Sequence, residues 1–186
     1  SNDIYPVSAD STLPFEQHRD IFYLSGIDQE ESILVLFPDS KKNGFKEMLF
    51  IRETNDHITH WEGEKLTKEK AKDISGINNI YWTNEFENIL IQIIKQSNNV
   101  YINTNEHYRQ NVETQTREDR FIEKLKKIGG INFKKSNPIL QKQRSIKDEI
   151  EIKLIEHACE ITRKGFERIL KFVKPGVWAV SYTHLR

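Results

Sequence analysis

The segment Pro14-Phe15-Glu16-Gln17-His18-Arg19-Asp20-Ile21-Phe22-Tyr23-Leu24-Ser25-Gly26 is the most informative stretch of this 186-residue chain. Gln17 and Asp20 stand just ahead of a β-rich run, where polar side chains can hydrogen-bond the neighbouring backbone and hold the chain as it enters a sheet. Tyr23 combines an apolar ring with a polar hydroxyl, which suits a sheet edge or a seam between domains. Gly26 permits a sharp turn. We therefore expect these four residues to have structural roles.

Short apolar runs downstream predict four β-strands. The run at residues 32–37 and the run at 48–51 are separated by the turn signal Lys42-Asn43-Gly44, so together they predict a hairpin. Residues 80–82 and 100–102 are two further apolar runs of strand length.

Two amphipathic segments predict helices. Apolar residues recur at helical spacing over 86–94, with Asn84 as the expected N-cap. A second such pattern covers 121–128 and is expected to end at Gly129-Gly130. Because strands alternate with helices of this length, the sequence predicts an α/β fold with a mixed β-sheet flanked by helices.

The longest predicted helix follows a composition shift at Asn137-Pro138. Ser145 and Asp148 have the spacing of a capping box, and an apolar stripe runs from Ile146 to Val173 before Pro175-Gly176 stops it. A stripe this long needs a large apolar partner, and the first 140 residues supply only part of one. We therefore expect exposed apolar surface on this helix and a tendency to self-associate.

Composition excludes several classes of function. Lys plus Arg and Asp plus Glu both number 28, so net charge offers no support for binding nucleic acid or a membrane surface. The lysines between Lys124 and Lys135 are read as a solvated surface. No run reaches the roughly 18 apolar residues of a membrane span. The single cysteine, Cys159, excludes an intrachain disulfide and fits a reducing compartment such as the cytoplasm.

One group of residues has the types that bind metals, namely His57, His60 and Glu62. Histidines three apart can bind one ion from a helix face. However, Ile58, Thr59 and Trp61 favour a strand, in which His57 and His60 would point to opposite faces. We therefore predict surface histidines rather than a metal site. His18 and His107 have no ligand-like neighbours in the sequence.

Three separated segments, residues 14–26, Trp61-Glu62-Gly63 and 144–149, resemble in order and spacing the N-terminal domain of Xaa-Pro aminopeptidase, also called aminopeptidase P, of the creatinase and prolidase superfamily. The family pattern is Ala-Asp, then Pro-aromatic, then Gln-x-x-Asp-x-x-Tyr-aromatic-Thr-Gly. The matching residues here are Ala9-Asp10, Pro14-Phe15, Gln17, Asp20 and Tyr23-Leu24-Ser25-Gly26. Glu16 stands where the family has Arg, so any contact of that Arg is not carried over.

The resemblance implies a domain organisation. Residues 1–143 correspond to the N-terminal domain, without the family's first helix and part of its first strand. Residues 144–178 correspond to the linker helix and the start of the catalytic "pita-bread" domain. Residues 179–186 do not match the family and are expected to be a truncation or cloning-derived tail.

The resemblance also implies a function for the whole enzyme, which removes the N-terminal residue preceding proline and uses two divalent metal ions, with manganese expected. The metal ligands belong to the catalytic domain, so no catalytic or metal-binding residue is expected in this chain. Its expected role is oligomerisation and shaping of the substrate cleft. The implied partners are its own C-terminal catalytic domain, further copies in a homo-dimer or tetramer, and a proline-containing peptide, with no nucleic acid and no membrane.

Two residues are implied to lie near the substrate. Trp61 would sit on a loop that reaches a neighbouring subunit's active site, where an indole can wall an apolar or proline-bearing peptide. Asp10 would lie near the same mouth. The alternative is that Trp61 packs in a local cluster and Asp10 caps a turn.

Other interpretations remain open from the sequence. The same domain occurs in prolidase and creatinase-like hydrolases, which the residues present here do not separate from aminopeptidase P. A catalytically dead relative that serves as a peptide- or protein-binding module, as in a histone-chaperone subunit, is the alternative from another class. An unrelated α/β domain is disfavoured because three segments agree in order.

Overall fold

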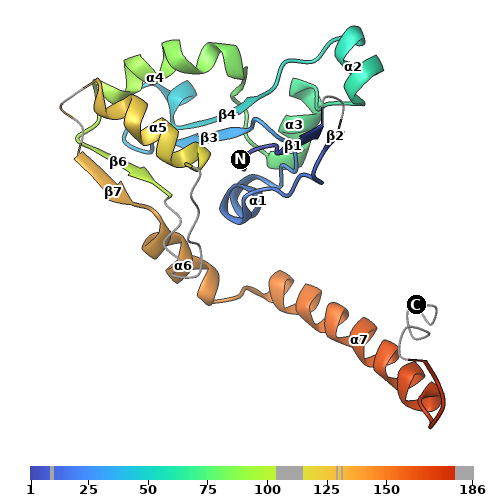
Figure 1. The fold of residues 1–186 in the computed structure, drawn as a ribbon. Helices are drawn as coiled ribbons and strands as arrows, with labels where there is room; N and C mark the ends of the chain where they lie inside the picture. The colour runs from blue at the N-terminus through green and yellow to red at the C-terminus, as the bar shows by residue number, and fades with distance from the viewer. Residues whose placement is uncertain (9–10, 104–114, 129, 131, 179–186) are drawn as a thin grey trace. The chain divides into compact units, whose positions relative to one another are not determined.

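The computed structural model describes residues 1–8, 11–103, 115–128, 130 and 132–178 (Figure 1). The chain divides into two compact units, Ser1–Pro138 and Ile139–Arg186. The first unit holds the strands and most of the helices, and the second is dominated by one long helix.

A three-stranded mixed sheet forms the centre of the first unit. Its middle strand β4 (Glu47–Ile51) pairs antiparallel with β3 (Ile33–Leu36) and parallel with β5 (Ile80–Trp82). The register sets Leu49 opposite both Leu34 and Ile80. The predicted hairpin, the third strand and the mixed pairing are therefore confirmed.

Strand β4 is buried on both faces, which is why its sequence is a continuous apolar run. Leu49 and Ile51 pack on one face with Ala71 of helix α3 (Lys68–Ser75). Met48 and Phe50 pack on the other face against helix α4 (Phe86–Ile94). Two apolar clusters thus sandwich one strand and fix its neighbours around it.

The fourth predicted strand, at residues 100–102, does not join the sheet that the other three strands form. Strand β6 (Asn99–Ile102) pairs parallel with β7 (Asn132–Lys135) in a separate two-stranded sheet. Its partner carries the sequence Asn-Phe-Lys-Lys, which has no apolar run and gave no strand signal. A further small pair joins β1 (Pro6–Ser8) to β2 (Ser11–Thr12), antiparallel.

The predicted helix starts need correction. Helix α4 is preceded by a 3-10 turn, η2 (Thr83–Glu85), and the Glu85 carboxylate accepts the Trp82 backbone N–H at 3.0 Å. Asn84 is not the N-cap, and its side chain instead donates to Glu53.

Helix α5 (Arg117–Lys126) begins with a capping box between Thr116 and Asp119. It ends before the predicted stop at Gly129-Gly130, of which Gly129 lies outside the described residues. Two further short elements are η1 (Asn43–Phe45) and α6 (Asn137–Ser145).

The long helix α7 (Glu149–Phe172) begins later than predicted. Ser145 belongs to α6, and the capping box is made by Asp148 and Glu151 instead. Asp148 accepts two backbone N–H groups, which satisfies donors that a helix start leaves unpaired. The predicted apolar stripe is exposed in this structure. Its exposed members are Ile146, Ile150, Leu154, Ile161, Phe166 and Val173.

Candidate functional site

Within residues 14–26, Arg19–Ser25 form a helix, where the sequence predicted the entry into a sheet. Helix α1 (Arg19–Ser25) is capped at its N-terminus by His18, whose Nδ1 accepts the Asp20 N–H at 3.2 Å. Its last turn closes at Gly26, which has a left-handed backbone (φ 67°) and donates its N–H to the Phe22 carbonyl at 2.7 Å. The predicted sharp turn is correct, because this geometry favours glycine.

Tyr23 lies on α1 with an exposed side chain, not at a sheet edge, and its position at a seam between domains stays a prediction. Asp20, in contrast, is buried in the first turn of that helix. Asn103, just after β6, donates to Asp20 Oδ2 at 2.7 Å and lies 3.0 Å from His18 Nε2. Asp20 thus connects α1 to the end of a strand more than 80 positions away.

Gln17 connects the same motif to the chain beyond α2 (Asp56–Glu62). Its side chain donates to the Gln29 carbonyl at 2.8 Å, and its Oε1 accepts the His18 N–H at 2.8 Å. The buried Gln29 side chain in turn accepts the Leu66 N–H at 2.7 Å. Gln17 therefore has the backbone-holding role predicted for it, although what it holds is a helix start and a loop.

Trp61 lies at the end of α2 and is 74% exposed. Its indole makes one ring contact within the described residues, edge-to-face with His60 at 5.2 Å between centroids. The exposed indole does not fit the alternative that Trp61 packs in a local cluster. Asp10, the second residue implied to lie near substrate, falls outside the described residues.

The strand predicted around His57 and His60 is wrong, because this segment is helical. Asn55 caps α2 by accepting the Ile58 N–H at 2.9 Å, a local signal that outweighs the β preference of Ile58 and Thr59. The two histidines are therefore three apart on a helix. Even so, no group of three or more His, Cys, Asp or Glu side chains with metal-site geometry occurs among the described residues.

A cluster of charged residues anchors the C-terminal end of α2. Arg52 and Glu62 form a two-pronged pair, with Nη1 to Oε2 at 2.6 Å and Nη2 to Oε1 at 2.8 Å. Arg52 also faces Glu30 at 3.7 Å and Glu31 at 3.9 Å, and Lys65 pairs with Glu30. We refer to these five residues, Glu30, Glu31, Arg52, Glu62 and Lys65, as the Arg52 cluster.

Two members of the Arg52 cluster keep their charge although they are partly buried. Burial acts to lower the pKa of Arg52, but the hydrogen bond to Glu62 and the surrounding carboxylates outweigh it and raise the pKa. Burial acts likewise to raise the pKa of Glu30, while Lys65 and Arg52 hold that pKa below its usual value. Both shifts favour the charged forms of Arg52 and Glu30.

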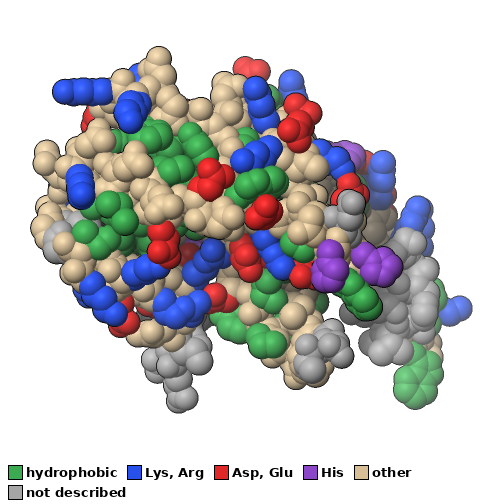
Figure 2. Space-filling model, turned by 90° about the horizontal axis from the view of Figure 1, so that it is seen from above, with side chains coloured by type: hydrophobic (Ala, Val, Ile, Leu, Met, Phe, Trp, Pro, Cys, Tyr) green, Lys and Arg blue, Asp and Glu red, His purple; other side chains and the backbone are tan. Residues whose placement is uncertain are grey.

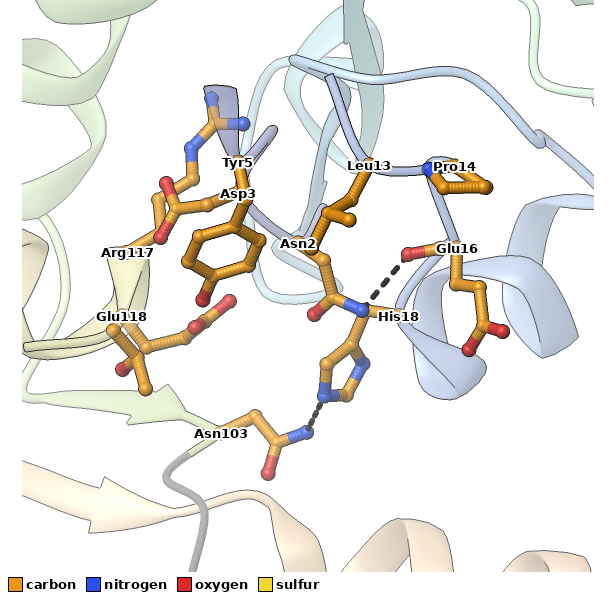
Figure 3. Close-up of a pocket in the computed structure, with 11 residues that line it drawn as sticks. Asn2, Asp3, Tyr5, Leu13, Pro14, Glu16, His18, Asn103, Arg117 and Glu118 are labelled. Atoms are coloured by element: carbon orange, nitrogen blue, oxygen red, sulfur yellow. Dashed lines mark hydrogen bonds between the residues drawn. The ribbon is translucent and has the colours of Figure 1, made fainter. Parts of the chain in front are cut away.

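A pocket of about 310 Å³ lies beside the segment that leads into helix α1 (Figure 3). Its walls come from the N-terminal segment, the start of α1, the end of β6 and the start of α5, and include Asp3, His18, Asn103, Arg117 and Glu118. The Asn103 contact to His18 forms part of its wall. Acidic and basic groups are mixed there, so the lining selects neither an anion nor a cation by charge.

Figure 2 shows acidic and basic side chains interspersed over the face in view. One ion pair among the described residues joins Lys124 of α5 to Glu87 of α4. No helix in the described part of the chain combines the length and apolarity needed to cross a bilayer.

Sequence reasoning missed the residues that connect these elements. Gln29, Arg52, Leu66 and Asn103 carried no motif that marked them. The spacing of Asn55 ahead of Ile58 is an N-cap signal that could have revealed α2, and α2 would have placed Glu62 near Arg52.

Comparison with solved structures defines the class of this fold. A Bacillus anthracis protein provisionally designated aminopeptidase P superposes with a TM-score of 0.83 at 24% identity, over 96% of this chain and 42% of the other. Escherichia coli aminopeptidase P gives a TM-score of 0.76 at 24% identity, over 97% and 41% respectively.

Sequence comparison assigns the family. The profile described as "Aminopeptidase P, N-terminal domain" matches residues 1–101, and this chain belongs to that family. Xaa-Pro aminopeptidase of Haemophilus influenzae is 27% identical over 89% of this chain and 36% of its own length. The Escherichia coli Xaa-Pro aminopeptidase is 25% identical over 92% and 39% respectively. The chain thus spans little more than a third of the length of these relatives.

One related structure is a zinc-substituted Escherichia coli aminopeptidase P in complex with product, so metal is bound in that enzyme. The described residues of the present chain provide no matching ligand group.

Proposed function

We propose that this chain is the non-catalytic N-terminal domain of a metal-dependent Xaa-Pro aminopeptidase, and that it shapes the substrate cleft of the complete enzyme. Family membership and the Xaa-Pro aminopeptidases among its relatives support this proposal. Under this proposal, residues 1–143 form the N-terminal domain, and residues 144–178 form the linker helix and the start of the catalytic domain. The complete enzyme is a cytoplasmic homo-oligomer with two divalent ions, manganese being the expected metal.

The observation that carries the proposal is the exposed indole of Trp61. Exposing most of an indole to water forfeits the stabilisation that burial of its large apolar surface would provide. A tryptophan held outward on an anchored helix is consistent with a surface that meets a ligand or another subunit. In our proposal Trp61 walls the cleft of a neighbouring subunit, with Asp10 near the same opening.

The exposed stripe of α7 also supports the proposal. Its apolar side chains would be covered by the catalytic domain that follows the linker helix. Covering them would remove a substantial apolar surface from water, and each Å² of apolar surface that is buried stabilises the protein by roughly 25 cal/mol.

The test uses the full-length protein and an Xaa-Pro-Xaa tripeptide with added Mn²⁺. Trp61→Ala is compared with Trp61→Phe, which keeps an aromatic ring, and with Tyr101→Ala, a matched exposed aromatic on β6. We expect Trp61→Ala to lower kcat/KM roughly tenfold, and the other two to stay near the parent value. A parent without peptidase activity would overturn the proposal and favour a catalytically dead relative. Preference for a dipeptide ending in proline would favour a prolidase.

A further inference from the structure

Helix α2 has little apolar contact with the rest of the first unit. Among its described side chains only Ile58 is half-buried, and the others are exposed. A helix of two turns is marginal on its own in water. Polar contacts at its two ends must therefore determine how it is held.

The N-terminal end of α2 is held locally. The Asn55 side chain accepts the Ile58 N–H, and Thr59 Oγ1 donates to the Asn55 carbonyl at 3.0 Å. These contacts close the first turn, but they connect residues that are neighbours in sequence. They do not determine where the far end of α2, with Trp61, is placed relative to the sheet.

The C-terminal end is held over a longer distance by the pair of Arg52 and Glu62. Arg52 directly follows Ile51, which is fully buried as the last residue of β4. A two-pronged guanidinium–carboxylate pair fixes orientation as well as distance. The Arg52 side chain is only 24% exposed, so solvent screens this pair less than it screens a fully exposed one.

The rest of the Arg52 cluster holds Arg52 and the chain that leaves α2. Glu30 and Glu31 face the guanidinium, and Glu31 has a left-handed backbone (φ 55°), uncommon for a residue with a side chain. Lys65 pairs with Glu30, with both side chains less than 15% exposed. Glu62 and Lys65, on either side of Gly63, are thus tied to one cluster immediately after Trp61.

We propose that Arg52 is a positioning residue that acts through Glu62 to hold Trp61 in its outward orientation. This inference rests on the proposed function for its catalytic consequence, but not for its structural content. Arg52 does not touch substrate in this scheme. It limits the positions open to the indole, so that less ordering is required when a peptide binds.

The structural test uses the full chain labelled with 5-fluorotryptophan, whose three tryptophans give three ¹⁹F signals. Trp61→Phe assigns the signal of Trp61. Arg52→Gln and Glu62→Gln each remove the ion pair between Arg52 and Glu62. Glu64→Gln is the matched control, because Glu64 lies two positions after Glu62 and its exposed ion pair is with Lys70.

We expect the Trp61 signal to shift and narrow in both pair-breaking variants, because a released indole moves more freely. The Trp82 signal should stay unchanged, which also shows that the fold is intact. Glu64→Gln should leave all three signals in place. An unchanged Trp61 signal in Glu62→Gln, a mild change at a half-exposed side chain, would overturn the inference.

The kinetic test uses the full-length protein and separates this inference from the proposed function. We expect Glu62→Gln to raise KM for an Xaa-Pro-Xaa peptide roughly threefold to tenfold when Trp61 is present, and to have no further effect in a Trp61→Ala background. If Trp61→Ala is itself without effect, the proposed function fails, while the ¹⁹F result still decides the positioning role. Equal effects of Glu62→Gln in both backgrounds would contradict action through Trp61.

Discussion

Phe50 is the residue whose replacement tests the packing argument most directly. It is fully buried in the middle of β4. Its ring stacks on Tyr81 at 5.3 Å between centroids and meets Phe86 edge-to-face at 5.0 Å. Through these contacts it connects two neighbouring strands of the sheet to helix α4.

The expected cost of Phe50→Leu follows from these contacts. Each aromatic pair contributes about 0.5–1.5 kcal/mol beyond its buried area, so losing two pairs costs about 1–3 kcal/mol. The smaller side chain also leaves unfilled space, which adds about 1 kcal/mol. We therefore expect Phe50→Leu to lower the free energy of unfolding by about 2–4 kcal/mol, a large fraction of the roughly 5–15 kcal/mol typical of a domain.

The measurement is urea unfolding of the full chain, followed by tryptophan fluorescence, with the slope against denaturant checked for constancy. Met48→Leu is the matched control, because Met48 is equally buried in the same apolar cluster but makes no aromatic pair. A volume-conserving exchange of this kind costs less than about 1.5 kcal/mol. If Phe50→Leu costs no more than Met48→Leu, the aromatic contacts do not stabilise the sheet as argued here.

Further predictions concern the backbone, a helix cap and pH. Gly26→Ala should lower the free energy of unfolding by about 1–2 kcal/mol because φ is 67° there, whereas Gly44→Ala, with an ordinary φ, should cost clearly less in the same urea assay. Asp148→Ala should reduce α7 stability by about 0.5–2 kcal/mol, seen as an earlier loss of helical circular dichroism on heating; an unchanged melt would contradict the capping role. The pKa of Glu30 is lowered by folding, so its stabilising contribution is present above its usual value of 4.5 and is lost as pH falls through the folded pKa. The difference in urea midpoint between the parent and Glu30→Gln should therefore be largest near neutral pH and vanish in acid, and a difference independent of pH would rule out the ion pair with Lys65 as its source.

Local patterns in the sequence were sufficient for the central elements. The apolar runs that became β3, β4 and β5 were each recognisable, because residues of all three strands pack into both apolar clusters, which leaves few polar positions. The helical spacing of α4 was equally clear. Predicted helix starts were less accurate, because the cap is decided by competing side chains within a few residues, as Asn84 and Glu85 show.

The motif at residues 14–26, which contains helix α1, shows a different limit of prediction from sequence. Its residues were identified through the family resemblance, but the sheet entry predicted for Gln17 and Asp20 is the start of a helix in the structure. Asp20 is paired by Asn103, and Gln17 reaches Gln29, at sequence separations that no local pattern encodes. The long-range partners of these residues were therefore not predictable from the sequence.

The sequence by itself determined the mixed α/β fold, the central strands and the turn at Gly26, because these depend on local chemistry and apolar periodicity, while the family followed from the resemblance of three motif segments. Only the tertiary structure decided that Trp61 is exposed at the end of α2, and that Arg52 and Glu62 meet to anchor this helix. The physical reason is that ion pairs and buried hydrogen bonds depend on distances set by the whole fold. Charged residues are frequent in this chain, and their sequence positions do not reveal which of them become neighbours.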